Sequence, residues 1–200
     1  MLTSVPFWFL RHGETDWNAQ NLSQGSTDIP LNAHGMEQAG VAAVALGGRG
    51  IRSVVASPLC RARATADIVG AALGLPVEVE ADLREVAFGA QEGQPMGDWY
   101  DDWIAGRFTP PGAETFAALR ARAVAAANRA LQHERPVLIV AHGALFRALR
   151  AEMGLSPHVR TPNALPLLCE PGASAGLPWR LLAAEPGLVP REVNPLQEIA

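Results

Sequence analysis

Residues 5–14 read VPFWFLRHGE, and their chemical character changes abruptly after Leu10. Residues 5–10 are apolar or aromatic, which is typical of a short buried strand. Arg11, His12 and Gly13 follow at once. A strand that ends in this way delivers a guanidinium and an imidazole to one edge of a sheet.

The same arrangement occurs twice more along the chain. Residues 53–56 and 137–140 are apolar runs that read as strands, followed by SPLCR at 57–61 and AHG at 141–143. Further strands are predicted over residues 77–79 and 179–183, and helices over 35–46, 61–73, 115–133 and 143–153, each closed by Gly or Pro. Alternating strands and helices predict an α/β fold, with a mostly parallel sheet covered by helices on both faces.

The loops after these strands should meet, because ligands in such folds bind beyond the carboxyl ends of the strands. Arginine forks match the geometry of phosphate oxygens, and Arg11 and Arg61 would supply two of them. A helix that begins at Gly143 would add N–H donors and a positive dipole end. The sequence therefore predicts a phosphate site at this edge.

His12 is the predicted nucleophile of this site. A neutral imidazole can attack phosphorus, and nearby arginines lower the pKa of a histidine and so favour its neutral form. The other ring nitrogen should donate to a backbone carbonyl, which fixes the tautomer. Glu85, in a turn within residues 83–89, is the candidate that protonates the leaving oxygen and then activates water.

Composition limits the alternatives. The 200 residues suit one domain, residues 1–200, and the formal net charge of −4 argues against a nucleic-acid-binding protein. No apolar run is long enough to cross a membrane, and the N-terminus lacks signal-peptide features. Cys60 and Cys169 cannot form a disulfide framework, so a reducing cytoplasm is the expected compartment.

A metal site is the main chemical competitor. The sequence contains no HExxH, HxH or CxxC spacing, and Asp16 and Asp28 are the nearest candidate ligands to His12. We therefore expect no metal. His34, His133 and His158 have no convergent partners in the sequence and are expected at the surface.

Five blocks of the sequence carry a family resemblance. They are residues 9–18 (FLRHGETDWN); 24–32 (QGSTDIPLN) with Gly35, Gln38 and Ala39; 57–62 (SPLCRA) with Thr65 and Ala66; 83–85 (LRE) with Phe88, Gly89, Glu92 and Gly93; and 141–143 (AHG). Together and in this order they resemble the histidine phosphatase superfamily, in its phosphoglycerate-mutase-like branch, over about residues 7–149. One RHG is weak evidence, whereas five ordered blocks are specific.

The resemblance implies a three-layer α/β/α sandwich and a phosphohistidine intermediate on His12. It implies phosphate contacts from Arg11, Arg61 and His142, and proton transfer by Glu85. Further contacts are implied for Asn18, Gln24, Gly25 and Gly143. The family needs neither a metal nor an organic cofactor.

The chain departs from the family pattern at two places. Ser26 stands where an aromatic residue is frequent, and the segment of about residues 94–112 is short compared with that of the mutases. An open site favours hydrolysis, so the expected function is a phosphatase acting on a small-molecule phosphate ester. A mutase is the alternative, and a non-catalytic binding module on this fold is a weaker one.

The segment at 94–112 has two interpretations. Trp99 and Trp103 would share a helix face, with Tyr100 and Phe108 nearby. We favour packing of these aromatic residues on the body of the protein over the alternative, a lid that walls the site. In a lid, the aspartates at 98, 101 and 102 would disfavour polyanionic substrates. The sequence leaves the oligomeric state open, with a homodimer as one alternative.

Overall fold

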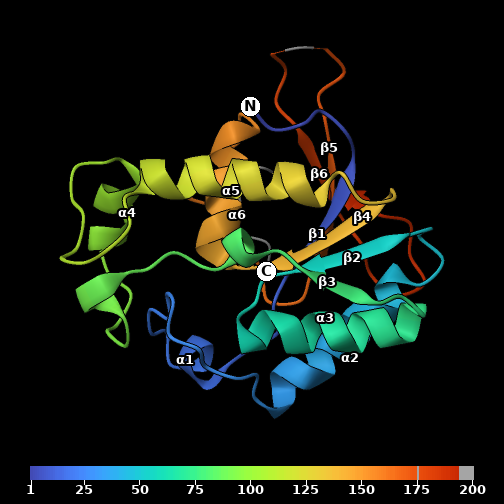
Figure 1. The fold of residues 1–200 in the computed structure, drawn as a ribbon, viewed down its shortest axis with the longest axis horizontal. Coiled ribbons are helices and arrows are strands. Elements are labelled where there is room, and N and C mark those ends of the chain that lie inside the picture. The colour runs from blue at the N-terminus through green and yellow to red at the C-terminus, as the bar shows by residue number, and fades with distance from the viewer. Residues whose placement is uncertain (175, 194–200) are drawn as a thin grey trace.

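The computed structural model describes residues 1–174 and 176–193 (Figure 1). Residue 175 and residues 194–200, which belong to the expected single domain, lie outside the described residues. Seven strands form one sheet in the order β3-β2-β4-β1-β5-β6-β7. Their bounds are β1 Phe7–Arg11, β2 Ser53–Ala56, β3 Val77–Val79, β4 Val137–Ala141, β5 Pro166–Glu170, β6 Arg180–Ala183 and β7 Arg191–Glu192.

The sheet has a parallel half and an antiparallel half. β3, β2, β4 and β1 are parallel neighbours, and the register pairs both Leu10 and Ala56 with Val140. The loops that follow β1, β2 and β4 therefore start side by side. β5, β6 and β7 are antiparallel additions, so the expectation of a mostly parallel sheet is wrong for this half. Antiparallel neighbours need no helical crossover, and the described residues after α6 contain none.

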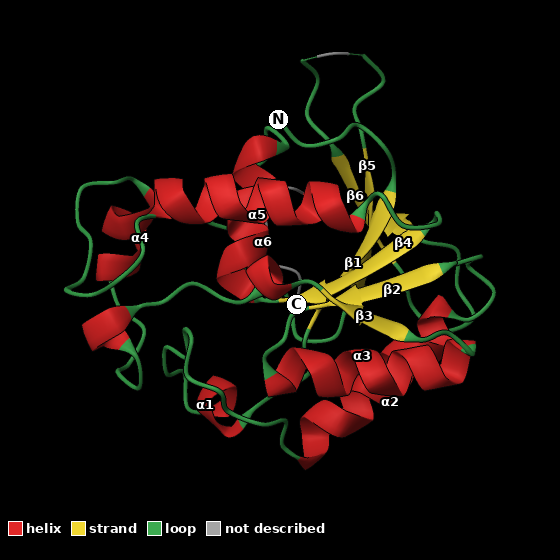
Figure 2. Cartoon of the chain, viewed as in Figure 1, coloured by secondary structure: helices red, strands yellow, loops and turns green. Residues whose placement is uncertain are grey.

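Helices cover both faces of the sheet (Figure 2), as expected for a three-layer α/β/α sandwich. α2 (Ala33–Leu46) and α3 (Cys60–Leu73) cover one face, and α5 (Phe116–Ala130) and α6 (Gly143–Glu152) cover the other. Phe7 and Phe9 belong to the core beneath α5 and α6, whereas Trp8 and Leu10 belong to the core against α2 and α3. Both faces of β1 are thus buried, which explains its uninterrupted apolar run.

Several elements escaped prediction. β5 begins at Pro166 in a stretch rich in Pro and Gly, a composition typical of loops. A proline is tolerated at the first residue of a strand, and the pairing of Pro166 with Leu10 uses that tolerance. The short helix α1 (Asp16–Ala19), the 3₁₀ turns η1 (Ala81–Leu83) and η2 (Gly89–Gln91) and strand β7 were also not predicted. The helix expected from the spacing of Trp99 and Trp103 is present as α4 (Trp99–Ile104).

Residues 94–112 pack on the body through aromatic side chains. Trp103 is completely buried, its ring meets that of Phe116 edge-on at 5.2 Å, and its Nε1 donates to the carbonyl oxygen of Glu114. Phe88 contacts both Trp103 and Tyr100. The packing interpretation is therefore confirmed for Trp103. In the described part of the chain, no helix has the length and apolar character needed to cross a membrane.

Candidate active site

Two histidines lie together where β1 and β4 end. The ring centroids of His12 and His142 are 5.2 Å apart, and both side chains are buried. The backbone N–H of His12 donates to the carbonyl oxygen of Ala141 at 3.0 Å, which joins the two loops directly. The parallel register of β1 and β4 thus brings together residues 130 positions apart.

His12 is held in one tautomer. Its Nδ1 lies 2.7 Å from the carbonyl oxygen of Gly13, and a carbonyl can only accept, so Nδ1 carries the proton and Nε2 keeps its lone pair. This confirms the expected bond to a backbone carbonyl. Burial, and then the charges of Arg61 and Arg11, hold the pKa of His12 well below 6.5. The imidazole is therefore neutral and nucleophilic at neutral pH.

The two arginines are buried with part of each guanidinium unused. Arg11 Nη1 donates to the carbonyl oxygen of Thr161 at 2.7 Å. Arg61 donates through Nη1 to Thr27 and through Nη2 to Gly25, each to a carbonyl oxygen at 2.8 Å. Burial, followed by the nearby charge of Arg160, lowers the pKa of Arg11 to about 10, so it stays charged at neutral pH.

His142 has one satisfied ring nitrogen. Its Nε2 lies 2.7 Å from the hydroxyl oxygen of Ser57, whereas its buried Nδ1 has no partner among the described residues. Burial, and then the positive charge of Arg61, keep the pKa of His142 well below 6.5. A neutral His142 can donate one hydrogen bond through Nδ1 if Ser57 donates to Nε2.

Most of the buried polar side-chain atoms without a partner in the described part of the chain lie at this site. Among the described residues they include Arg11 Nε, Arg61 Nε, His142 Nδ1 and Gln24 Oε1. Leaving a buried donor unpaired is costly, so such groups usually serve a function. The three nitrogens are suited to a ligand that carries several acceptor oxygens.

Glu85 is fixed by backbone donors at the start of α6. Its Oε2 accepts from the N–H of Ala144 at 2.9 Å, and its Oε1 accepts from those of Leu145 at 2.9 Å and Val86 at 3.0 Å. Each carboxylate oxygen has two lone pairs, so Oε2 keeps one for a proton. From α5, Arg122 donates to the carbonyl oxygens of Asp82 and Arg84, which fixes the turn that carries Glu85.

The four remaining predicted residues also lie in this region. Asn18, Gln24, Gly25 and Gly143 all line the same cavity as His12. Asn18 accepts from the backbone of Thr15 through Oδ1, which caps α1, and this leaves its amide N–H groups for other contacts. A Cβ atom built at Gly143 would lie 3.3 Å from Arg11 Nε, so the missing side chain lets the guanidinium approach α6.

Glu92 organises the loop that follows α1, a role that its sequence block did not reveal. Its carboxylate accepts hydrogen bonds from both the N–H and the hydroxyl of Ser26 and of Thr27, and from the N–H of Phe88. Burial alone would raise the pKa of Glu92, but these hydrogen bonds outweigh it and the pKa is lowered. Gly25 sits beside it with φ of +54°, and a Cβ atom there would collide with the Glu92 carboxylate.

The cavity measures about 240 Å³ and includes residues that the sequence did not indicate. Arg147, Arg160 and Thr161 line it together with every predicted site residue except His142, and Tyr100, from the segment considered as a lid, lines it as well. Arg147 lies four residues after Gly143, so helical spacing could have placed it on the same face of α6. Arg160 and Thr161 lie in the loop before β5, and no sequence signal marked that loop because β5 itself was missed.

The expected surface and metal-competitor residues lie elsewhere. His34, His133 and His158 are exposed, and His158 pairs with Asp101 at 2.9 Å. Asp16 is exposed on α1, and Asp28 accepts from the backbone N–H of Cys60. Within residues 1–174 and 176–193, no three His, Cys, Asp or Glu side chains form a group that could hold a metal ion.

Comparisons with known proteins identify the family. A family model described as the histidine phosphatase superfamily (branch 1) matches residues 7–164. The chain belongs to this superfamily. The resemblance drawn from the five sequence blocks is thereby confirmed, as is the fold that it implied.

The relatives of this superfamily member include phosphatases and mutases. It is 41% identical over 150 residues to the "uncharacterized phosphatase PhoE" of Bacillus subtilis, covering 72% of this chain and 75% of that one. It is 36% identical to the "probable phosphoglycerate mutase GpmB" of Yersinia enterocolitica, over 76% of each chain. A mycobacterial glucosyl-3-phosphoglycerate phosphatase, solved with VO3, superposes with a TM-score of 0.74 at 31% identity, covering 89% of this chain and 97% of that one. The expected class, an enzyme acting on phosphate esters, is confirmed at the level of the family.

Proposed function

We propose that this protein hydrolyses phosphate monoesters of small molecules through a phosphohistidine on Nε2 of His12. The observation that carries this proposal is the buried, neutral imidazole of His12, whose free Nε2 shares a cavity with the guanidinium groups of Arg11 and Arg61. His142, through Nδ1, is the third donor to the phosphoryl oxygens. Fixed donors of this kind stabilise the charge that the transition state spreads over these oxygens.

The reaction has two steps. The Nε2 lone pair of His12 attacks phosphorus, the ester P–O bond breaks, and Glu85 gives its proton to the leaving oxygen. A water molecule then attacks the phosphorus of the phosphohistidine, while the Glu85 carboxylate takes a proton from that water molecule. The P–N bond breaks and its electron pair returns to Nε2. Asn18, Gln24, Gly25 and Gly143 complete the proposed phosphate contacts.

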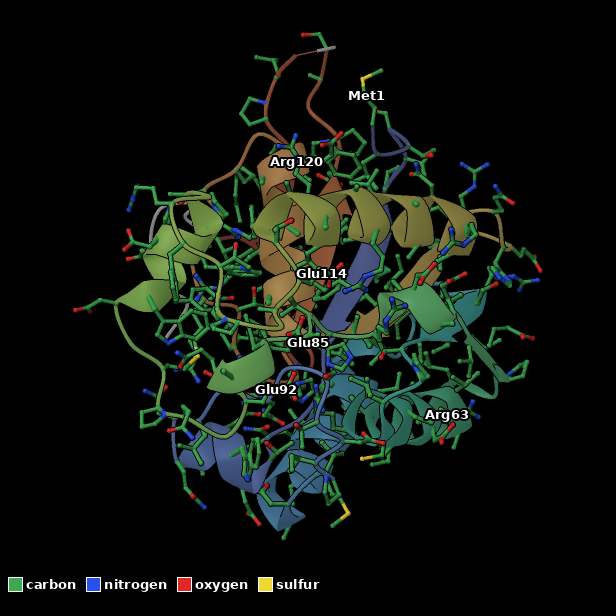
Figure 3. All side chains as sticks on the ribbon, turned by 60° about the vertical axis from the view of Figure 1, so that its left-hand side comes forward. Met1, Arg63, Glu85, Glu92, Glu114 and Arg120 are labelled. Carbon is green, nitrogen blue, oxygen red and sulfur yellow. The ribbon has the colours of Figure 1, made fainter. Side chains whose placement is uncertain are left out.

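The proposal is tested with p-nitrophenyl phosphate. His12→Ala should lower kcat by at least about 10³-fold, because no other group replaces the nucleophile. Mass spectrometry of acid-quenched wild-type enzyme should find acid-labile phosphate on His12. Arg63→Gln is the matched control, since Arg63 pairs with Asp67 on the outside of α3 and lies well apart from Glu85 in Figure 3. Full turnover by His12→Ala would disprove the mechanism.

A mutase is the second candidate, and the relative named as a probable phosphoglycerate mutase favours it. A mutase returns the phosphoryl group to the substrate, so it should interconvert phosphoglycerates, require a bisphosphorylated primer and release little phosphate. A phosphatase should release phosphate at the same rate with or without the primer. Measuring both products in one assay separates the two functions.

Neither a metal nor an organic cofactor takes part in the proposed chemistry. Activity should therefore survive dialysis against a chelator, and vanadate should inhibit because it imitates the five-coordinate transition state. The compartment that we propose is the cytoplasm, since Cys60 and Cys169 are both free thiols.

A further inference from the structure

The cavity contains more positive charge than one phosphate group needs. Its lining includes Arg11, Arg61, Arg147 and Arg160, but Glu85 is the single acidic residue among the described residues that line it. A phosphate monoester brings a charge of about −2 at neutral pH. In the proposed first step Glu85 carries the proton that it gives to the leaving oxygen, so four positive charges against the ester leave a surplus of two (4 − 2), in a protein whose net charge is −4.

Arg147 is held in place before any ligand arrives. Its Nη1 donates to the carbonyl oxygens of Pro157 and His158 at 3.1 and 2.7 Å, and its guanidinium lies 5.0 Å from the ring centre of Tyr100. Neither contact neutralises its charge, and within the described chain no carboxylate forms an ion pair with it. Because the guanidinium group of Arg147 is already fixed, binding of an anion costs little further side-chain conformational entropy.

The loop that Arg147 holds carries two further groups toward the cavity. Arg160 is exposed and makes no hydrogen bond or ion pair with the rest of the described chain. Thr161 is 2% exposed, and its Oγ1 is one of the buried polar atoms that lack a partner. An exposed guanidinium and a buried, unpaired hydroxyl on adjacent residues of one cavity wall indicate a place for ligand oxygens.

We propose that Arg147, Arg160 and Thr161 bind a second anionic group, a carboxylate or a second phosphate, on the part of the substrate that does not react. This inference rests on the proposed function, and it narrows the substrate class to phosphate monoesters with two anionic ends. Guanidinium forks suit both kinds of anion.

None of the aspartates at 98, 101 and 102 lines the cavity, so they do not face a substrate bound there in the way that the sequence suggested for a lid. Asp101 pairs with His158, and Asp102 pairs with Arg107. Asp98 is exposed and is not part of the cavity lining. The α4 residue that does reach the cavity is Tyr100, on whose ring Arg147 rests.

Two matched substrate pairs test the inference and identify the anion. 3-Phosphoglycerate and glycerol 3-phosphate differ by a carboxylate, and fructose 1,6-bisphosphate and fructose 6-phosphate differ by a phosphate. Wild-type kcat/KM should favour the doubly anionic member of at least one pair by about tenfold, mainly through KM. Arg147→Gln and Arg160→Gln should each reduce this ratio several-fold, Arg160→Lys should retain part of it, and Arg63→Gln should leave it unchanged.

Failure of the inference is distinguishable from failure of the proposed function. Hydrolysis of p-nitrophenyl phosphate that depends on His12, together with a ratio near one for both pairs, would overturn the second anion site alone. A preference that persists in both glutamine variants would overturn the assignment to these arginines. If no substrate releases phosphate, binding of each pair to the His12→Gln variant is measured by calorimetric titration. Equal dissociation constants for the two members of both pairs would reject the second anion site. Tighter binding of the doubly anionic member that is lost when Arg160→Gln is added to His12→Gln would support it.

Discussion

The two nitrogens of the His142 ring lie in different surroundings, and the difference assigns a role to Ser57. Nδ1 can donate to a phosphoryl oxygen only if Nε2 is the acceptor of the ring. The Ser57 hydroxyl, 2.7 Å from Nε2, can supply the proton that makes it so. Ser57 also accepts from the backbone N–H of Leu59, so its oxygen is fixed at the end of β2. We infer that Ser57 is a positioning residue that acts through His142.

Replacement of Ser57 should therefore impair catalysis more than stability. In Ser57→Ala, His142 is free to adopt the other tautomer, and kcat/KM for p-nitrophenyl phosphate should fall by about tenfold, the equivalent of one hydrogen bond. Ser57→Thr keeps the hydroxyl and should restore most of the activity. The ¹⁵N chemical shifts of the His142 ring report the tautomer directly. An unchanged tautomer in Ser57→Ala would remove this role for Ser57.

At the scale of the elements, the start of α6 serves two groups at once. Its first N–H groups hold Glu85, and its first residue, Gly143, lets Arg11 pack against it. Gly143→Ala should displace the guanidinium of Arg11 by a few tenths of an ångström, because a Cβ atom there would lie 3.3 Å from Nε. We expect kcat/KM to fall several-fold while the midpoint of thermal unfolding stays the same or rises, since alanine favours a helix.

Gly40 provides the matched control for that variant. It lies within α2, and a Cβ atom built there would meet nothing within 4 Å. Gly40→Ala should therefore stabilise the protein by about 0.5–1 kcal/mol and leave kcat/KM unchanged. Equal activity of Gly143→Ala and Gly40→Ala would show that the contact between Arg11 and α6 is unimportant for catalysis.

The elements that sequence predicts well are those with a local cause. β1, β2 and β4 are short, mostly apolar and mostly buried, and polar residues stand at or directly after the end of each. Both the strands and the convergence of Arg11, His12 and His142 were therefore visible in the sequence. The loop with Arg160 and Thr161 was not, because its place depends on β5 pairing with β1 across 150 residues or more. The support that Glu92 gives to Ser26 and Thr27 is equally non-local.

At the scale of the whole molecule, charge is distributed unevenly. The net charge is −4, yet the cavity gathers four arginines, and many remaining charges form exposed pairs such as Arg63 with Asp67 and Arg107 with Asp102. Exposed pairs of this kind contribute little to stability. The buried arginines of the site instead lower the free energy of unfolding in acid, because their charges, together with burial, oppose protonation of His12 and His142. This effect should appear in the dependence of stability on pH.

The free energy of unfolding should fall as the pH falls below about 6.5. In the unfolded chain His12 and His142 bind protons near that pH, whereas in the folded protein burial and the neighbouring arginines keep both neutral to a much lower pH. The unfolded state then binds more protons than the folded state, so acid favours unfolding, by up to about 1.4 kcal/mol per pH unit for each histidine. The loss should continue until the pH reaches the lowered pKa values.

Urea unfolding between pH 7 and 5.5 measures this loss of stability above the pH range in which carboxylates titrate. The double variant His12→Gln with His142→Gln should lose most of the dependence of the unfolding free energy on pH. An equal slope in that variant would mean that other groups, outside the site, set the acid stability.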